Sequence, residues 1–261
     1  MGIVIMVCSL PGCGIRGAPS ENQEIKPDDI LQAWKELPKA GLENMDTTSA
    51  AILAQQLSRT GPNGLKPLID VIGDPASTPE AKVLAVISLT PLVDSGMAPR
   101  LMEMTAPGLD PTTRSCAAHL LGVLESPEIT ARLRELCDDE EQQVRTAATI
   151  VLVMRQDPEI LDRIPEIWHS PETTMKQRED LAYMLPESFA ATHPELMGAI
   201  ATDLDLASGA RQRALMFLGR FGAKSDILAL QTCATTDPDP ALRALALDAI
   251  DAIEERAAGK P

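Results

Sequence analysis

Residues that commonly carry catalysis or hold a metal are few in this sequence. The three histidines, His119, His169 and His193, are far apart, and no HExxH or CxxC motif occurs, so a zinc site is not expected. The acidic run from Asp138 to Glu141 better suits a solvated helix N-terminus than a cation site, because carboxylates are favourable at the positive end of a helix dipole. We expect no metal, no cofactor and no enzymatic activity.

One stretch formally matches a cofactor motif. The segment from Gly12 to Gly17 reads GxGxxG after a short apolar run, which is the pattern of a dinucleotide-binding turn. Such a turn needs a helix directly after it and alternating strands further on. Ala18-Pro19-Ser20 follows instead, and no later segment has the periodicity of a strand. We therefore do not expect a dinucleotide-binding domain.

The strongest signal is an internal repeat of about 32 residues. In each copy a basic residue is followed by a small or apolar residue three positions later and a large aliphatic residue seven positions later. The copies are Lys82-Ala85-Leu89, Arg114-Ala117-Leu121, Arg145-Ala148-Leu152, Arg178-Leu181-Leu185, Arg211-Ala214-Leu218 and Arg243-Ala246-Ile250. An earlier copy, Ala50-Leu53-Leu57, lacks the basic residue.

The repeat predicts pairs of helices. Offsets of three and seven lie on one face of a helix, and a second amphipathic segment precedes each copy. Breakers such as Gly73-Asp74-Pro75 separate the two segments. Neither helix of a pair can bury its apolar face alone, so the pairs must stack. We predict an all-α superhelical solenoid of about seven stacked helix pairs over residues 27–258.

Acidic residues stand six positions before the basic residue in four of the copies. These pairs are Asp139 and Arg145, Glu172 and Arg178, Asp205 and Arg211, and Asp237 and Arg243. With this feature the sequence resembles HEAT-repeat proteins, specifically the short-unit HEAT-like type found in phycobilisome lyases, over roughly residues 27–256. The resemblance implies a structural ladder in which Asp and Arg link neighbouring units, with Arg114 and Lys82 as further members. The first three copies depart from the spacing.

The resemblance also bears on activity. HEAT-like iron hydroxylases that act on a lysine-derived side chain use repeated His-Glu pairs, and no His-Glu dipeptide occurs in this sequence. Bilin-lyase activity stays open, because members of that group are recognised mainly by their repeats.

The N-terminal segment ends in a cysteine motif. Leu10-Pro11-Gly12-Cys13 follows an apolar run and resembles the lipobox of bacterial lipoproteins. The resemblance implies that residues 1–12 are a signal peptide, that Cys13 is lipidated and that residues 13–26 form a flexible tether. Residues 1–12 contain no Lys or Arg, so a start codon further upstream, or an apolar N-terminus without a role, are the alternatives.

Composition limits the partners. There are 38 acidic and 23 basic residues, giving a net charge of -15, which disfavours nucleic acid because binding to phosphates relies on Lys and Arg. We expect a protein or peptide partner with a basic surface. Trp168, Tyr183 and Phe189 lie close together in a sequence poor in aromatics and could form a partner-contact patch, although rings that fill an irregular core are the simpler interpretation.

These observations predict a non-catalytic scaffold of the bacterial cell envelope that binds its partner in the groove of the solenoid. The membrane would be reached through the lipid anchor only. The alternative is a cytosolic HEAT-like regulator, or an enzyme of the bilin-lyase type, with a misassigned N-terminus. The sequence does not indicate an oligomeric state.

Overall fold

The computed structural model describes residues 26–37, 46–61 and 63–259, and no strand occurs among them. The expected signal peptide, Cys13 and the tether up to residue 25 lie outside the described residues. The chain divides into two compact units, residues 3–148 and residues 149–261, with the boundary inside α8. Each unit is described by itself.

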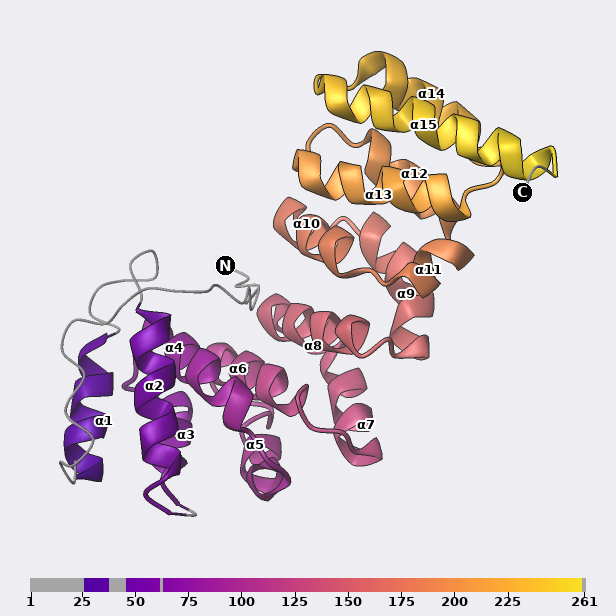
Figure 1. Ribbon diagram of the computed structural model, residues 1–261. Helices are drawn as coiled ribbons and strands as arrows, with labels where there is room; N and C mark the ends of the chain where they lie inside the picture. The colour runs from indigo at the N-terminus through magenta and orange to yellow at the C-terminus, as the bar shows by residue number, and fades with distance from the viewer. Residues whose placement is uncertain (1–25, 38–45, 62, 260–261) are drawn as a thin grey trace. The chain divides into compact units, whose positions relative to one another are not determined.

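Unit 1 consists of helix pairs that stack through their second helices. Its helices are α1 (Pro27–Glu36), α2 (Thr47–Ser58), α3 (Lys66–Gly73), α4 (Pro79–Leu89), α5 (Ala98–Glu103), α6 (Pro111–Leu121) and α7 (Pro127–Leu136), with 3-10 turns η3 (Thr90–Leu92) and η4 (Ser95–Met97) before α5. The second helices α2, α4 and α6 lie side by side in chain order (Figure 1). Helix α8 (Gln142–Met154) begins in this unit and ends in the next.

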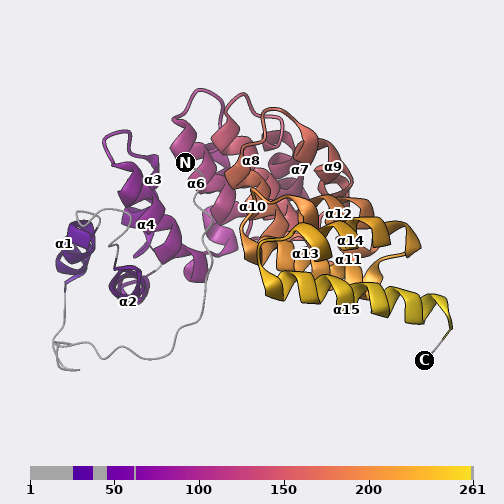
Figure 2. The same ribbon diagram turned by 90° about the horizontal axis from the view of Figure 1, so that it is seen from above.

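Unit 2 is also built of stacked helix pairs. Its helices are α9 (Pro158–His169), α10 (Met175–Met184), α11 (Glu187–Thr192), α12 (Pro194–Thr202), α13 (Ser208–Phe221), α14 (Ile227–Thr236) and α15 (Pro240–Ala257), with the 3-10 turn η5 (Lys224–Asp226) before α14. Helix α13 contacts α10 on one side and α15 on the other. Figure 2 shows the pair α14–α15 lying against the pair α12–α13.

Helix starts follow from turn chemistry. Most of the helices begin with Pro in the first turn, where its missing N–H would have no intrahelical partner, and several are capped by a side chain that accepts a backbone N–H. Asp46, Asp110 and Asp239 cap α2, α6 and α15 in this way. The Pro and Asp residues of the breakers therefore end one helix and start the next.

The buried stripe matches the predicted repeat. The small residues three positions after the basic residue are buried in the core: Ala85, Ala117, Ala148, Ala214 and Ala246, with Leu181 in the irregular copy. Small residues also bring neighbouring helices together, because an added Cβ at Gly219 of α13 would lie 3.4 Å from the Cβ of Ala249 on α15. The all-α fold of stacked helix pairs is confirmed.

Trp34 anchors α1 to unit 1. Its side chain is fully buried, and its indole Nε1–H donates to Ser88 Oγ of α4 at 3.0 Å. A buried indole normally finds such an acceptor, so this contact fixes the helix as well as filling space. No helix in the described ranges is long and apolar enough to cross a membrane.

Candidate functional site

The repeated basic residues of unit 1 reach the following helix pair. Lys82 of α4 donates to Asp110 Oδ2 and to Thr113 Oγ1, each at 2.8 Å, and Arg114 of α6 forms an ion pair with Asp139. Partial burial raises the pKa of Asp110, but the hydrogen bonds from Lys82 and Thr113 outweigh it, so this pKa lies below its ordinary value. Both cations are buried, and both carboxylates come from the turn of the next pair.

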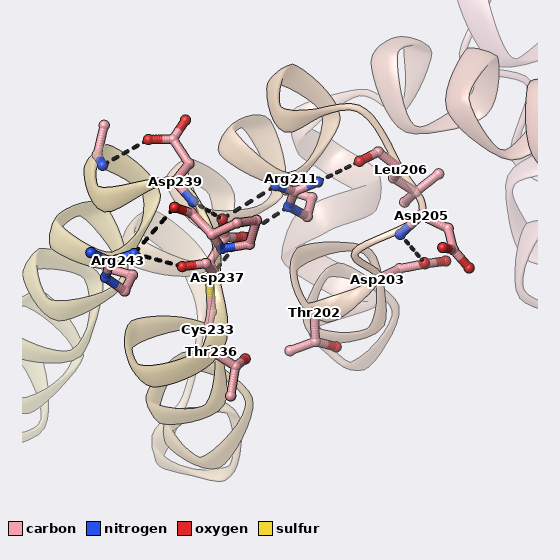
Figure 3. A network of polar contacts seen from close by, with 12 residues as sticks. Thr202, Asp203, Asp205, Leu206, Arg211, Cys233, Thr236, Asp237, Asp239 and Arg243 are labelled. Carbon is pink, nitrogen blue, oxygen red and sulfur yellow. Dashed lines mark hydrogen bonds and ion pairs between the residues drawn. The ribbon is translucent and has the colours of Figure 1, made fainter.

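Unit 2 repeats this contact between α13 and the turn before α15. Arg211 donates through Nε to Asp237 Oδ2 at 2.9 Å and through a terminal nitrogen to Asp237 Oδ1 at 3.2 Å (Figure 3). Asp237 also accepts from the backbone N–H of Asp239 at 2.9 Å. Burial raises the pKa of Asp237, but Arg211 and the Asp239 N–H outweigh burial and leave this pKa below its ordinary value. The carboxylate thus joins two helix pairs and shapes its own turn.

The expected acid–base pairs differ in detail from the contacts. Within their own copies, two of these arginines bond a backbone carbonyl of the turn: Arg145 donates to Asp139 O at 2.8 Å, and Arg243 donates to Asp237 O at 2.8 Å. Asp205 is exposed and does not bond Arg211, because Asp203 takes the turn position and accepts the Asp205 N–H at 3.1 Å.

The irregular copy departs further from the expected spacing. Arg178 Nε donates to Trp168 O at 3.1 Å, ten residues upstream. Glu172 itself lies in the exposed turn between α9 and α10, where its N–H donates to Ser170 Oγ. The six-residue spacing therefore marks the turn and not the ion pair.

The three aromatic residues of the expected contact patch are not exposed together. Trp168 and Phe189 are buried, and the Phe189 ring stacks on His193 with 4.3 Å between ring centroids. Tyr183 alone reaches the surface, with 39% of its area exposed. A partner at the surface of unit 2 could therefore touch Tyr183, whereas the other two rings fill the core.

Tyr183 lies beside a cleft between α13 and α15. An added Cβ at Gly209 would lie 2.6 Å from Tyr183 Oη, so the absence of a side chain there lets the hydroxyl lie against the first turn of α13. The neighbouring residue, Ser208, lines a cleft of about 370 Å³. The cleft is lined by Ser208, Gln212, Asp239, Ala241, Leu242, Ala244, Leu245 and Asp248.

The cleft is acidic with an apolar rim. Its two charged lining residues, Asp239 and Asp248, are both carboxylates, and no described cation forms an ion pair with either. Met216 stands one helical turn after Gln212 on the same face of α13 and is 58% exposed. We call Asp239, Asp248, Gln212, Met216 and Tyr183 the cleft face.

Two further clefts among the described residues of unit 1 lie beside α1. The larger, about 510 Å³, is lined by Lys35 together with Asp70 and Asp74, so its charges are mixed. The smaller, about 320 Å³, has Asp28 as its one charged lining residue. Among the described residues, no group of three or more His, Cys, Asp or Glu side chains is placed to hold a metal ion.

Sequence reasoning missed Met216 and Asp248, although the repeat contained the signal. Tyr183, Met216 and Asp248 each stand five residues after the basic residue of their copy, so they occupy the same position on successive second helices. The expected patch consisted of aromatic residues that are close in the sequence, whereas these three residues share one solvent-facing position of the repeat.

The stacked pairs and their shared turn contacts define an all-helical repeat protein of the HEAT-like type. Among solved structures, the chain is similar to human deoxyhypusine hydroxylase in complex with glycerol, at 16% sequence identity and a TM-score of 0.36, with 88% of this chain and 97% of that chain covered. No protein-family model and no curated protein sequence matches.

This comparison corrects the expected function. The similar structure is that of an enzyme, which contradicts the expectations of a non-catalytic scaffold and of a chain that is not an enzyme, and both are withdrawn. At this identity the likeness concerns the fold alone and assigns no reaction to this chain.

Proposed function

We propose that the protein is a HEAT-like regulator that recognises a basic segment of a protein partner at the cleft face of unit 2. The supporting observation is the charge of the cleft, where Asp239 and Asp248 are unopposed by any described cation and exposed Met216 offers an apolar contact. Complementary charge favours encounter and orientation, and an exposed apolar side chain adds area that can be buried. The same contacts would bind a basic segment of a substrate or of a regulated partner equally well.

The size of the cleft favours binding of a short peptide segment over binding of the surface of a folded partner. A volume of about 370 Å³ is at the lower end of the roughly 300–1,000 Å³ range of ligand pockets, and takes a few side chains. A Lys or Arg side chain could place its charged end beside Asp248 and its methylene groups beside Leu245 and Met216. We therefore expect the partner to alternate basic and apolar residues.

A peptide-binding experiment tests this proposal. The probe is a fluorescein-labelled peptide in which Lys alternates with Leu, and fluorescence anisotropy measures its affinity. Asp248→Asn should weaken binding by up to about fivefold, the range of one exposed ion pair. Asp239→Asn should act in the same direction while keeping the cap of α15, because Asn caps helices as well as Asp does.

Asp162→Asn on α9 is the matched control. It removes the same charge from an exposed position of unit 2 outside the cleft, and it should change affinity less than twofold, on the order of surface substitutions in general. Equal affinity of wild type and Asp248→Asn would refute the cleft face as the binding site. The alternative of a bilin-lyase-type enzyme predicts instead a visible absorbance band in the purified protein or after mixing with a free bilin.

We further propose that the protein is held at the bacterial envelope through lipid on Cys13, which lies outside the described residues. The support is the resemblance of Leu10 to Cys13 to a lipobox. In its native host, wild type should incorporate an alkyne-tagged fatty acid and fractionate with membranes, and Cys13→Ser should do neither, because stable anchoring needs the acyl chains. Cys8→Ser is the matched control. Unlabelled, soluble wild type would favour a cytosolic protein.

A further inference from the structure

Helix α15 exposes a position that stacking buries elsewhere. Four residues after the repeated basic residue, Val86 of α4, Ala118 of α6 and Leu215 of α13 are all buried. The equivalent residue of α15, the last second helix described, is Leu247, and it is 54% exposed. In a stack of helix pairs this position faces the following pair, so Leu247 presents an unoccupied stacking contact.

Within the described part of the chain, Arg243 of the same helix lacks the ion pair that three of its counterparts make, as does Arg178 of the irregular copy, which bonds the Trp168 carbonyl. Lys82, Arg114 and Arg211 each form an ion pair with a carboxylate of the following pair. Arg243 donates only to the carbonyls of Asp237 and Pro238 in its own turn, at 2.8 and 3.3 Å, and no carboxylate of the described residues lies within ion-pair distance. We call Arg243 and Leu247, one helical turn apart, the tail face.

Helix α2 presents the other half of such a contact. Asp46 caps α2 and accepts the backbone N–H of Ser49 at 2.8 Å, just as Asp110 caps α6 and accepts the N–H of Thr113 at 3.0 Å. The sequences Asp46-Thr-Thr-Ser and Asp110-Pro-Thr-Thr are alike in this turn. Asp110 also holds Lys82 of the preceding pair, whereas no described cation pairs with Asp46.

An apolar residue lies near Asp46 on the same helix. Ile52 stands two residues after Ala50 and is 36% exposed. The residues at the same position of α4 and α6, Leu84 and Cys116, are buried. We call Asp46 and Ile52 the head face.

We infer that the protein associates head to tail, with the tail face of one copy bound to the head face of the next. The contact would reproduce between two chains the ion pair and the apolar packing that join successive pairs within unit 1. The two faces differ, so the contact is heterologous and leaves a free face at each end unless a ring closes. The charge of -15 opposes association at low salt, but at physiological salt the Debye length of about 8 Å screens distant charges more than a close pair.

Sedimentation velocity of the full chain over a wide concentration range tests the inference. The weight-average mass of wild type should rise above the 28.0 kDa of one chain as concentration increases. Arg243→Glu and Asp46→Lys should each weaken association roughly tenfold or more, because like charges then face each other. An equimolar mixture of the two variants should regain the wild-type mass, since each variant's altered face then meets an opposite charge.

Matched controls separate this contact from general effects. Leu247→Gln should weaken association, and Leu204→Gln, at a similarly exposed position in the turn between α12 and α13, should not. Asp46→Asn keeps the cap of α2 and removes only its charge, and circular dichroism verifies that each variant is folded. Wild type that stays at 28.0 kDa at every concentration, or folded charge variants that do not associate when mixed, would overturn the inference.

Discussion

Replacing Asp237 by alanine should lower the free energy of unfolding by about 3–5 kcal/mol, the range for removing one partner of a buried ion pair. The Asp237 carboxylate is fully buried, accepts two hydrogen bonds from Arg211 and shapes its turn through the Asp239 N–H. Its loss leaves the Arg211 guanidinium buried with only the Leu206 carbonyl as acceptor. Urea unfolding followed by circular dichroism measures the change.

Two further variants test whether the unpaired Arg211 guanidinium causes the loss of stability in Asp237→Ala. Glu187→Ala removes the exposed partner of Arg220 in the same unit and should cost less than about 1 kcal/mol. Arg211→Met combined with Asp237→Ala removes the stranded charge as well, so the double variant should be more stable than Asp237→Ala alone. A cost for Asp237→Ala no larger than for Glu187→Ala would contradict the buried ladder.

Acidification should destabilise the protein through His119. Burial in the second helix α6 lowers the pKa of His119 from 6.5 to about 4. Because the folded-state pKa is depressed, the unfolded chain binds this proton first, and stability falls as pH drops from about 6.5 towards 4. The loss due to this residue should reach about 3 kcal/mol by pH 4, at 1.36 kcal/mol for each unit of pKa. Urea unfolding at a series of pH values measures it.

His119→Gln isolates this contribution. The variant cannot take up the proton, so its stability should depend less on pH over this window, by about the same 3 kcal/mol. His169→Gln, which removes an exposed imidazole from the same protein, is the matched control. Identical pH profiles for wild type and His119→Gln would show that folding does not change the pKa of this imidazole, and would contradict the prediction.

The repeat made most of the fold predictable. The stripe of Ala85, Ala117 and Ala214 identified the second helices because a helix that stacks on neighbours needs small residues at fixed spacing. Two further features could not be read from spacing. The irregular pair around α11 depends on Pro186, which ends α10 and starts a short extra helix. The division within α8 depends on contacts between residues far apart in the sequence.

The ladder and the cleft were predictable only in part. The repeated acidic and basic residue types are visible in the sequence, but a pattern within one copy could not reveal that Arg211 bonds its own turn through a carbonyl and the next pair through a carboxylate. Asp110 seemed to break the spacing to Arg114, yet its partner is Lys82 of the preceding copy. The cleft depends on which side chains remain exposed to solvent after the helix pairs stack. The sequence pattern alone does not determine that exposure.

The turn carboxylates also bear on how such a chain could evolve. Each ion pair of the ladder joins residues 25 to 28 positions apart. The pair α5–α6 carries both an acceptor for the preceding cation, Asp110, and a cation for the next acceptor, Arg114. Duplication or deletion of a whole pair would preserve this complementarity at the new junction. A change of one residue within a turn would instead remove an acceptor that two neighbours share. Proteins of this architecture can therefore change the number of helix pairs more readily than the amino-acid sequence of their turns.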